Sequence, residues 1–352
     1  MVPVIPSLAA GSGLEIGSSS NEEHVDDNGN SEPGTMNHGN SEPGTGNGER
    51  RRYDVVGIGE CSIDYVYRLP VLPTSRAPAA KMRISGHMVL AGGQVATTLA
   101  ACAALGLTAS YAGVLGDDEN GTRVRQDLKS RGVDTQAAVV RAAPNRYAVI
   151  LVDESTGERV VLWERDARLN LSREELPADL IRSARVLHLD NVDEEAAIEA
   201  ARIARDAGVA VTSDIDHVTS RTEQLLDFVT IPIFSEHVPR ELTGEADHQR
   251  ALRALRPRYG GWLGVTLGNR GSMLLEGERL HHAAAFELTA VDTTGAGDVF
   301  RGAFIYAWLR GDDPASILRF ANAAAAISCT RPGALGGVPT IDEVRALVEP
   351  MR

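Results

Sequence analysis

The amino-acid sequence predicts an α/β protein with a doubly wound, mostly parallel sheet flanked by helices, and a small β-sheet lid. From Tyr53 onward, short apolar runs bounded by glycine alternate with helical patterns, which is typical of βαβ units. Two pairs of strand-like segments interrupt this alternation without an intervening helix. Short turns cannot join neighbouring strands of a parallel sheet. We therefore expect these segments to form a second, smaller sheet.

The predicted elements follow one another in a regular order. YDVVGIGE is the first strand, and GQVATTLAACAALG is a small-residue helix that stops at Gly106, a glycine of the kind that ends helices. TASYAGVLG is the next strand, and NGTRVRQDLKSRGVDT is a polar-faced helix closed by Gly132. The alternation then continues through SARVLHLDN, EEAAIEAARIARDAG, VAVTSDID, FVTIPIFSE, HQRALRALRPRYGG, WLGVTLGNRGS and VDTTGAGDVFRGAFIYAW.

The lid is predicted from DYVYRLP, KMRISGHMVLAGG and RYAVILVDESTGERVVLWERD, with strands at about 64–70, 81–91 and 146–166. The last segment has the pattern of a hairpin that turns at ESTGE. Such a lid can exclude water from a cleft. Alternatively, the strands form an arm for dimer contacts, and both roles can coexist. We expect a homodimer through the lid.

Residues 1–50 differ in composition from the rest of the chain. They are rich in Gly, Asn, Ser, Glu and Pro and contain NSEPGT twice, at 30–35 and 40–45. Such a segment cannot bury enough apolar surface to offset its ordering entropy. We expect a disordered low-complexity tail, the alternative being a tail that carries an interaction motif. Eight acidic residues against one arginine lie in this tail, so the formal charge of -13 leaves only -6 for residues 51–352.

Charge and composition exclude several classes of protein. The mild acidity of residues 51–352 argues against a nucleic-acid partner and against a basic membrane-binding patch. No run of eighteen apolar residues is present, and the first residues lack the pattern of a secretory signal. Cys61, Cys102 and Cys329 have neither a disulfide nor a metal-ligand spacing. We expect a cytoplasmic protein with no nucleic-acid or membrane partner.

The stretch VDTTGAGDVFRGAF places glycines and aspartates at the start of an apolar helix. Unpaired N–H groups and the helix dipole make a helix start attractive to anions, and glycine lets an anion approach closely. Gly295, Ala296 and Gly297 would therefore bind a negatively charged group. Asp298 beside them would take the proton of a hydroxyl that attacks phosphorus. The alternative for Asp298 is a helix-start acid that adds about 0.3–1 kcal/mol of stability.

Two motifs resemble the signatures of the ribokinase-like (PfkB) carbohydrate kinases. DTTGAGDVFRGAF is similar to the C-terminal signature of that family, and AGGQVATTLAACAALG to its N-terminal signature. The resemblance extends from Tyr53 almost to the end of the chain, so we expect residues 51–352 to form one ribokinase-like kinase domain. FSEHVPRELTG and SCTRPGALGGVP look closest to sulfofructose-kinase-like and ketohexokinase-like members.

The resemblance assigns roles to residues by position. It implies Asp298 as catalytic base and 295–297 as anion hole. The implied substrate-binding residues are Asp64, Gly92, Gly93, Thr97, Lys81 and Arg165, and the implied nucleotide-binding residues are Thr266, Gly268, Gly271 and Asn322. Some of these residues have a structural alternative. Asp64 could cap a turn, residues 266–271 could form an ordinary tight loop, and Lys81 and Arg165 could lie on a solvent-exposed face.

The sequence departs from the family at the metal and sugar positions. Many members carry Asn and Glu three residues apart where this chain has Ser235 and Val238. Glu236 and Asp214, with Asp216, are then the predicted magnesium carboxylates, although the aspartates could instead cap a strand end. Asp292 and Thr294, with residues 329–337, match the family's monovalent-cation site. Family members often have a substrate-binding Asn at the position of Thr97, and an Asn would be expected at that of Trp163, so the sugar is not fixed.

The resemblance implies an ATP-dependent kinase that phosphorylates a hydroxymethyl group of a small sugar or sugar derivative, with ATP, Mg²⁺ and K⁺ as cofactors. An adenosine-type nucleoside kinase is the alternative, in which Tyr65, Tyr67 and Trp163 would offer an aromatic slot. A sugar-binding sensor with little catalysis is a third possibility. A dinucleotide-binding dehydrogenase is disfavoured because GIGECS has Ser62 in place of the third glycine, and the G-x-x-x-x-G-K-[ST] loop is absent.

Overall fold

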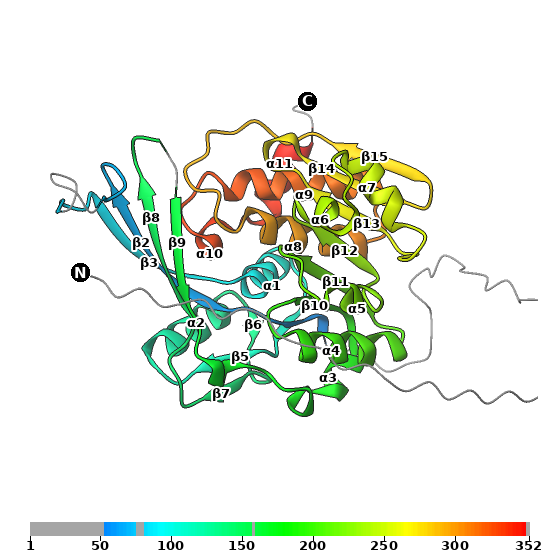
Figure 1. The fold of residues 1–352 in the computed structure, drawn as a ribbon, viewed down its shortest axis with the longest axis horizontal. Coiled ribbons are helices and arrows are strands. Elements are labelled where there is room, and N and C mark those ends of the chain that lie inside the picture. The colour runs from blue at the N-terminus through cyan, green and yellow to red at the C-terminus, as the bar shows by residue number, and fades with distance from the viewer. Residues whose placement is uncertain (1–52, 75–80, 157–158, 350–352) are drawn as a thin grey trace, which may run out of the picture. The chain divides into compact units, whose positions relative to one another are not determined.

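A computed structural model describes residues 53–74, 81–156 and 159–349, and Figure 1 shows their arrangement. The predicted tail, residues 1–50, lies outside the described residues. The main feature is a nine-stranded sheet with the strand order β15-β14-β13-β12-β11-β10-β1-β4-β6. Its strands are β1 (Tyr53–Ile58), β4 (Ala109–Tyr111), β6 (Val133–Asp134), β10 (Ala184–Asp190), β11 (Ala210–Ile215), β12 (Ile231–Phe234), β13 (Leu263–Thr266), β14 (Ser272–Glu276) and β15 (Arg279–Ala283).

The sheet is parallel from β6 to β13, and β14 and β15 add two antiparallel strands at one edge. This confirms the predicted fold class. The predicted alternation does not include the β14–β15 hairpin, which has no helix between its strands. Gly277 has φ 57° in the two-residue turn between them, a left-handed conformation that glycine adopts without strain.

Helices cover both faces of this sheet (Figure 1). Alternate residues of one strand face opposite sides, so Val56 belongs to one core and its neighbour Val55 to the other. Helices α3 (Ala178–Arg182), α4 (Glu194–Asp206), α5 (Thr222–Leu226), α6 (Val238–Thr243) and α7 (His248–Leu255) pack on the first core. On the opposite side lie α1 (Gln94–Ala104), α2 (Glu119–Ser130), α8 (Ala296–Leu309), α9 (Pro314–Ser328), α10 (Ala334–Gly337) and α11 (Ile341–Val348).

The predicted second sheet is present and has the strand order β3-β2-β8-β9. Strand β2 pairs with β3 antiparallel and with β8 parallel, and β8 and β9 form an antiparallel hairpin. Its strands are β2 (Ser62–Leu69), β3 (Gly86–Gly92), β8 (Tyr147–Asp153) and β9 (Arg159–Glu164). A further short pair joins β5 (Val114–Gly116) to β7 (Val139–Arg141). Within the described residues, every helix is too short or too polar to cross a bilayer.

Candidate active site

The start of α8 has the geometry of an anion-binding helix entrance. Gly295 precedes the helix with φ 77°, and a Cβ placed on it would lie 2.5 Å from the Cβ of Ala334 on α10. Both the backbone conformation and the close approach therefore require glycine. The N–H groups of the first helical turn have no partner within the helix, and the dipole makes this end positive. Gly295, Ala296 and Gly297 lie at this end.

Asp298 lies in the first turn of α8 and is partly exposed. Its backbone carbonyl accepts a hydrogen bond from Oγ1 of Thr98 at 3.1 Å, which holds the helix start against α1. Burial raises the pKa of its carboxyl group well above the ordinary value, and the neighbouring carboxylate of Asp214 raises it further. A carboxyl group with a raised pKa is a stronger base once ionised.

The loop before α8 is tied to residues 329–337. Oδ1 of Asp292 accepts from the backbone N–H of Thr294 at 2.9 Å, and Oδ2 accepts from that of Gly333 at 2.8 Å. The carbonyl of Cys329 accepts from the N–H of Val291 and Asp292, at 2.7 and 3.1 Å. Burial raises the pKa of Asp292, but the backbone donors outweigh it and hold the pKa below its usual value. The residues predicted to bind a monovalent cation are thus brought together, and both carboxylate oxygens have backbone donors.

Arg159 connects the small sheet to this loop, a contact that the sequence did not predict. It lies at the start of β9, and its Nη1 donates to Oγ1 of Thr293 at 3.2 Å and of Thr294 at 3.3 Å. Arg159 is exposed, and Thr294, which it contacts, directly precedes Gly295 in the sequence. A positive charge from the second sheet therefore stands beside the helix entrance.

A cavity of about 330 Å³ runs from the sheet edge to the helix entrance. The four predicted nucleotide-binding residues line it together with residues of the anion hole. Gly268 has φ 56° and open space at its Cβ position, whereas a Cβ on Gly271 would lie 2.0 Å from the carbonyl oxygen of Ala283. Nδ2 of Asn322 donates to that same carbonyl at 2.9 Å and shapes the wall. The lining includes Thr266, Gly268, Gly271, Phe286, Leu288, Thr293, Ala296, Gly297, Phe300 and Asn322.

Asp64 and the glycine pair meet at the junction of the two sheets. A Cβ on Gly92 would lie 2.6 Å from Oδ2 of Asp64, and one on Gly93 (φ 100°) would lie 2.6 Å from the Cα of Cys61. Burial raises the pKa of Asp64, which is 8% exposed, to about 6. Thr97 is buried in α1 beneath Gly295, and its hydroxyl has no partner among the described residues.

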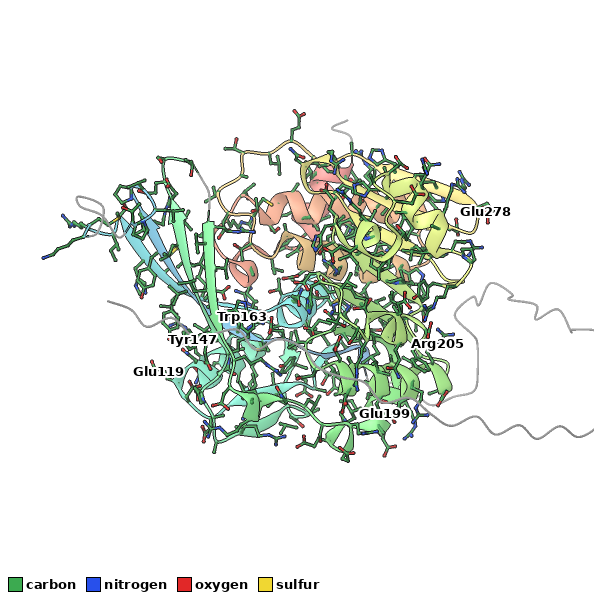
Figure 2. The ribbon with its side chains drawn as sticks, in the orientation of Figure 1. Glu119, Tyr147, Trp163, Glu199, Arg205 and Glu278 are labelled. Carbon is green, nitrogen blue, oxygen red and sulfur yellow. The ribbon has the colours of Figure 1, made fainter. Side chains whose placement is uncertain are left out.

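Trp163 shares the face of the small sheet that carries Asp64. Asp64 is paired with Ala148, and Ala148 with Trp163, and side chains of directly paired residues point to the same side of a sheet. The indole is 64% exposed, and the guanidinium of Arg146 lies 5.2 Å from its ring centre. Figure 2 shows Trp163 on β9. Tyr65 and Tyr67, by the alternation of β2, point to the opposite face.

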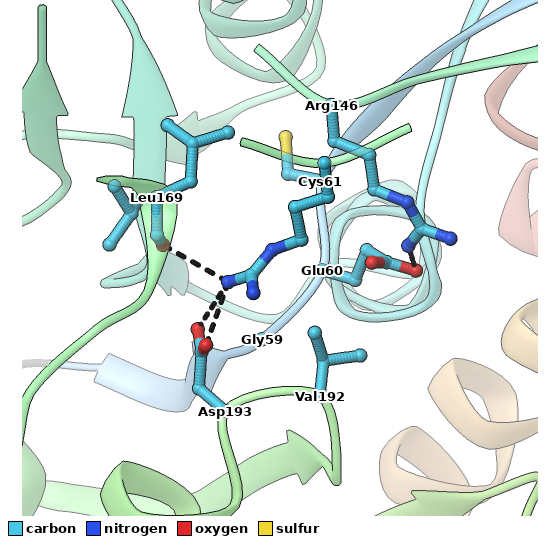
Figure 3. A pocket seen from close by; sticks show the side chains of 9 residues that line it. Gly59, Glu60, Cys61, Arg146, Leu169, Val192 and Asp193 are labelled. Atoms are coloured by element: carbon cyan, nitrogen blue, oxygen red, sulfur yellow. Dashed lines mark hydrogen bonds and ion pairs between the residues drawn. The ribbon is translucent and has the colours of Figure 1, made fainter. Parts of the chain in front are cut away.

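Two predicted substrate-binding residues lie away from the sheet face that carries Asp64 and Trp163. Lys81 is exposed in the connection before β3. Arg165 follows β9, and its Nη2 contacts both carboxylate oxygens of Asp193, at 2.7 and 2.8 Å, and donates to the carbonyl of Leu169 at 3.0 Å. Figure 3 shows Asp193 and Leu169, together with the nearby ion pair of Arg146 with Glu60. Arg165 is therefore engaged in holding the polypeptide after β9.

Each of the two predicted magnesium carboxylates is paired with an arginine. Glu236 is paired with Arg270, and Oδ1 of Asp214 lies 2.6 Å from Nη2 of Arg301. Among the described residues no three His, Cys, Asp or Glu side chains are grouped as metal ligands. Asp214 is buried against an arginine, so we withdraw it as a magnesium ligand. The sequence reasoning missed Arg301, although a charged residue inside the apolar run VFRGAFIYAW, three positions after Asp298, is a detectable signal.

The fold and the site define a phosphotransferase of the ribokinase-like class. A model of the pfkB family of carbohydrate kinases matches residues 53–341, and the chain belongs to this family. It is 30% identical to an ATP-dependent ribose-1-phosphate kinase of Halopiger xanaduensis and to fructokinase-1 of Zea mays, in each case over 84% of this chain and 97% of the relative. The structure of Arabidopsis thaliana ribokinase complexed with ribose and ATP has a TM-score of 0.72 and 26% identity, covering 85% of this chain and 99% of that chain.

Proposed function

We propose that this carbohydrate kinase transfers the γ-phosphoryl group of ATP to a hydroxymethyl group of a small sugar or sugar derivative. The observation that carries the proposal is the continuity of one cavity, from Thr266, Gly268 and Asn322 to Ala296 and Gly297 at the start of α8. A nucleotide in this cavity would direct its phosphates to the positive helix end. ATP in a related ribokinase structure supports the same ligand here.

In the proposed reaction, Asp298 removes the proton of the acceptor hydroxyl as its oxygen bonds to the γ-phosphorus. The bond from that phosphorus to the β–γ bridging oxygen breaks, and ADP leaves with the electron pair. The first-turn N–H groups of α8 stabilise the negative charge of the moving phosphoryl group. Magnesium, when bound, would shield the phosphate charge, with phosphate oxygens, water and one or two carboxylates as its ligands. We propose that Glu236 binds Mg²⁺ through a water molecule, and that Asp292 and Thr294 bind K⁺.

The acceptor is proposed to lie over Ala148, between Asp64 and Trp163. The small Ala148 side chain separates a carboxylate, which can accept hydrogen bonds from hydroxyls, from an exposed aromatic face. A flat apolar sugar face can lie on such a ring. The same indole favours the second candidate, a nucleoside, whose base would stack there. Competition between fructose and adenosine in a binding assay separates the two classes.

The test is a turnover screen of ketoses, aldoses, sugar acids and nucleosides with ATP and Mg²⁺, followed by Asp298→Asn on the best acceptor. Loss of a general base costs about 10²–10⁴ in kcat. Asp206→Asn is the control, because Asp206 is exposed at the end of α4. Near wild-type turnover by Asp298→Asn would refute the role of the base. Calorimetric sugar binding without ATP turnover at any magnesium concentration would instead indicate a sensor.

The homodimer is proposed to form through β9. This edge strand exposes Val160 and Leu162 on the face opposite Asp64, at 39% and 55%. An unpaired apolar edge strand is a surface that a second copy can cover. In sedimentation velocity, Leu162→Asp is expected to shift the protein from dimer to monomer, and a wild-type protein that sediments as a monomer would contradict the proposal.

The three free thiols accord with the proposed cytoplasmic location.

A further inference from the structure

Arg301 is a buried charge directly beneath the anion-binding helix start. It is 2% exposed, and it is the largest of the fully buried side chains in the described residues. Its Nη2 donates to the carbonyl of Ile233 at 2.9 Å and lies 2.6 Å from Oδ1 of Asp214. A Cβ placed on Gly297 would lie 2.8 Å from its Nη1. The guanidinium therefore fills the space between β11, β12 and the first turn of α8.

Asp214 and Asp298 form a carboxylate pair next to this arginine. Asp214 is 1% exposed near the end of β11, and its partner Arg301 lies against Gly297 one turn after Asp298, which places Asp214 beneath the same helix start. The carboxylate of Asp214 raises the pKa of Asp298. Two neighbouring carboxylates repel each other, so a nearby cation is needed for both to ionise. Arg301, one turn after Asp298 and in contact with Asp214, is that cation.

We propose that Asp298 acts as one member of a carboxylate pair with the buried Asp214, and that Arg301 is a positioning residue that holds Asp214 against Asp298 and balances the charge of the pair. The inference rests on the proposed role of Asp298 as the base. When Asp298 takes the acceptor proton, Asp214 accepts a hydrogen bond from the new carboxylic acid. The acceptor oxygen bonds to the γ-phosphorus, and the bond from that phosphorus to the β–γ bridging oxygen breaks. The proton stays within the pair until the product leaves.

The other titratable groups around this centre come from two strands. On β10, His188 donates to or accepts from Oγ1 of Thr212 at 3.0 Å, and its pKa is lowered to about 3 by burial and then by Arg301, so it stays neutral. Asp190, also on β10, has its pKa raised to about 8, first by burial. Asp216 follows β11 and adds negative charge. Among these groups, Arg301 is the cation that contacts the pair.

The experiment measures kcat against pH with ATP, Mg²⁺ and the best acceptor. Arg301→Met keeps an unbranched side chain, shorter than that of arginine, and removes its charge. We expect kcat at pH 7 to fall at least about tenfold, and the acid limb of the profile to move up by about one pH unit or more, because loss of the nearby cation disfavours the ionised pair. Asp214→Asn removes the repelling charge and moves the acid limb down.

The double variant Arg301→Met/Asp214→Asn has the same net charge as the wild type, so its acid limb is expected to return close to the wild-type position. Arg301→Lys, which keeps a positive charge, is expected to show the smaller shift. Should Arg301→Met fail to fold, the double variant and Arg301→Lys carry the test. An acid limb at the wild-type pH in every Arg301 variant, or a kcat that falls equally at all pH values, would overturn the inference.

The two proposals can fail separately. An inactive Asp298→Asn together with an unmoved acid limb would reject the pair while leaving Asp298 as the base. An active Asp298→Asn would reject the proposed base itself.

Discussion

Gly295 provides the strongest test of the close packing at the anion hole. Alanine at this position must adopt φ 77° and place its Cβ 2.5 Å from that of Ala334. Gly311, at the other end of α8, has φ 79° and no atom within 4 Å of its Cβ position. Gly311→Ala is therefore a matched control that introduces backbone strain without a clash.

The expected losses of stability follow from the backbone strain and from the steric clash. A non-glycine residue in the left-handed region costs about 1–2 kcal/mol, so Gly311→Ala should lower the free energy of unfolding by that amount. Overpacking against Ala334 adds about 1–3 kcal/mol, so Gly295→Ala should lose about 2–5 kcal/mol in total. Displacement of the helix entrance should also reduce kcat about 10²–10³-fold, the effect of losing one donor to a developing charge.

Urea denaturation gives the free energies of unfolding, and steady-state kinetics with the best acceptor give kcat. The control should keep its turnover. Equal losses of stability in the two variants would show that Gly295 and Ala334 are not in close contact. A Gly295→Ala enzyme with unchanged kcat would show that the start of α8 does not bind the transferred phosphoryl group.

Two further predictions concern Asp64 and Arg159. The raised pKa of Asp64 means that the folded state binds the extra proton between the unfolded value near 3.8 and about 6, so stability falls as pH rises through this window, by up to about 3 kcal/mol. Asp64→Asn should therefore be more stable than wild type at pH 7.5, equally stable at pH 4 or below, and weaker in sugar binding; a constant difference in melting temperature across this range would refute the shift. Arg159→Met removes the contact of β9 with Thr293 and Thr294 and should lower kcat several-fold while changing stability by no more than about 0.5 kcal/mol, since the side chain is exposed. Exposed Arg182 on α3 is the control as Arg182→Met, and full turnover by the Arg159 variant would contradict the linkage.

The sequence contained enough local information for the fold and for the glycine-rich part of the site. Periodicity and glycine stops marked the parallel strands and helices, because these signals lie within each element. The residues predicted for the nucleotide, Thr266 and Asn322 among them, line one cavity with the helix entrance. The β14–β15 hairpin was not predicted, since its apolar residues are buried at a sheet edge that local patterns do not define.

The charged partners could not be predicted in the same way. Asp214 and Glu236 carry carboxylates, which are common metal ligands. In the folded chain, Arg301 forms an ion pair with Asp214 and Arg270 forms one with Glu236. Arg159 meets Thr293 across more than 130 residues of chain, a contact that no local pattern contains. Arg165 was predicted to contact the substrate, yet Asp193 and Leu169 engage it. Ion pairs between distant segments decide which carboxylates remain available to a ligand.

The central position of β1 has a consequence for the synthesis of this protein. Strand β1 is flanked by β4 and by β10, and the latter begins at Ala184. A nascent chain that ends before this residue leaves one side of β1 unpaired and lacks most of the core that surrounds Val56. Sheet completion then waits for a partner more than a hundred residues downstream, and closing such a long loop slows folding. Ribosome-bound or truncated forms that stop after β9 should therefore depend on chaperones and be sensitive to proteases until β10 is added.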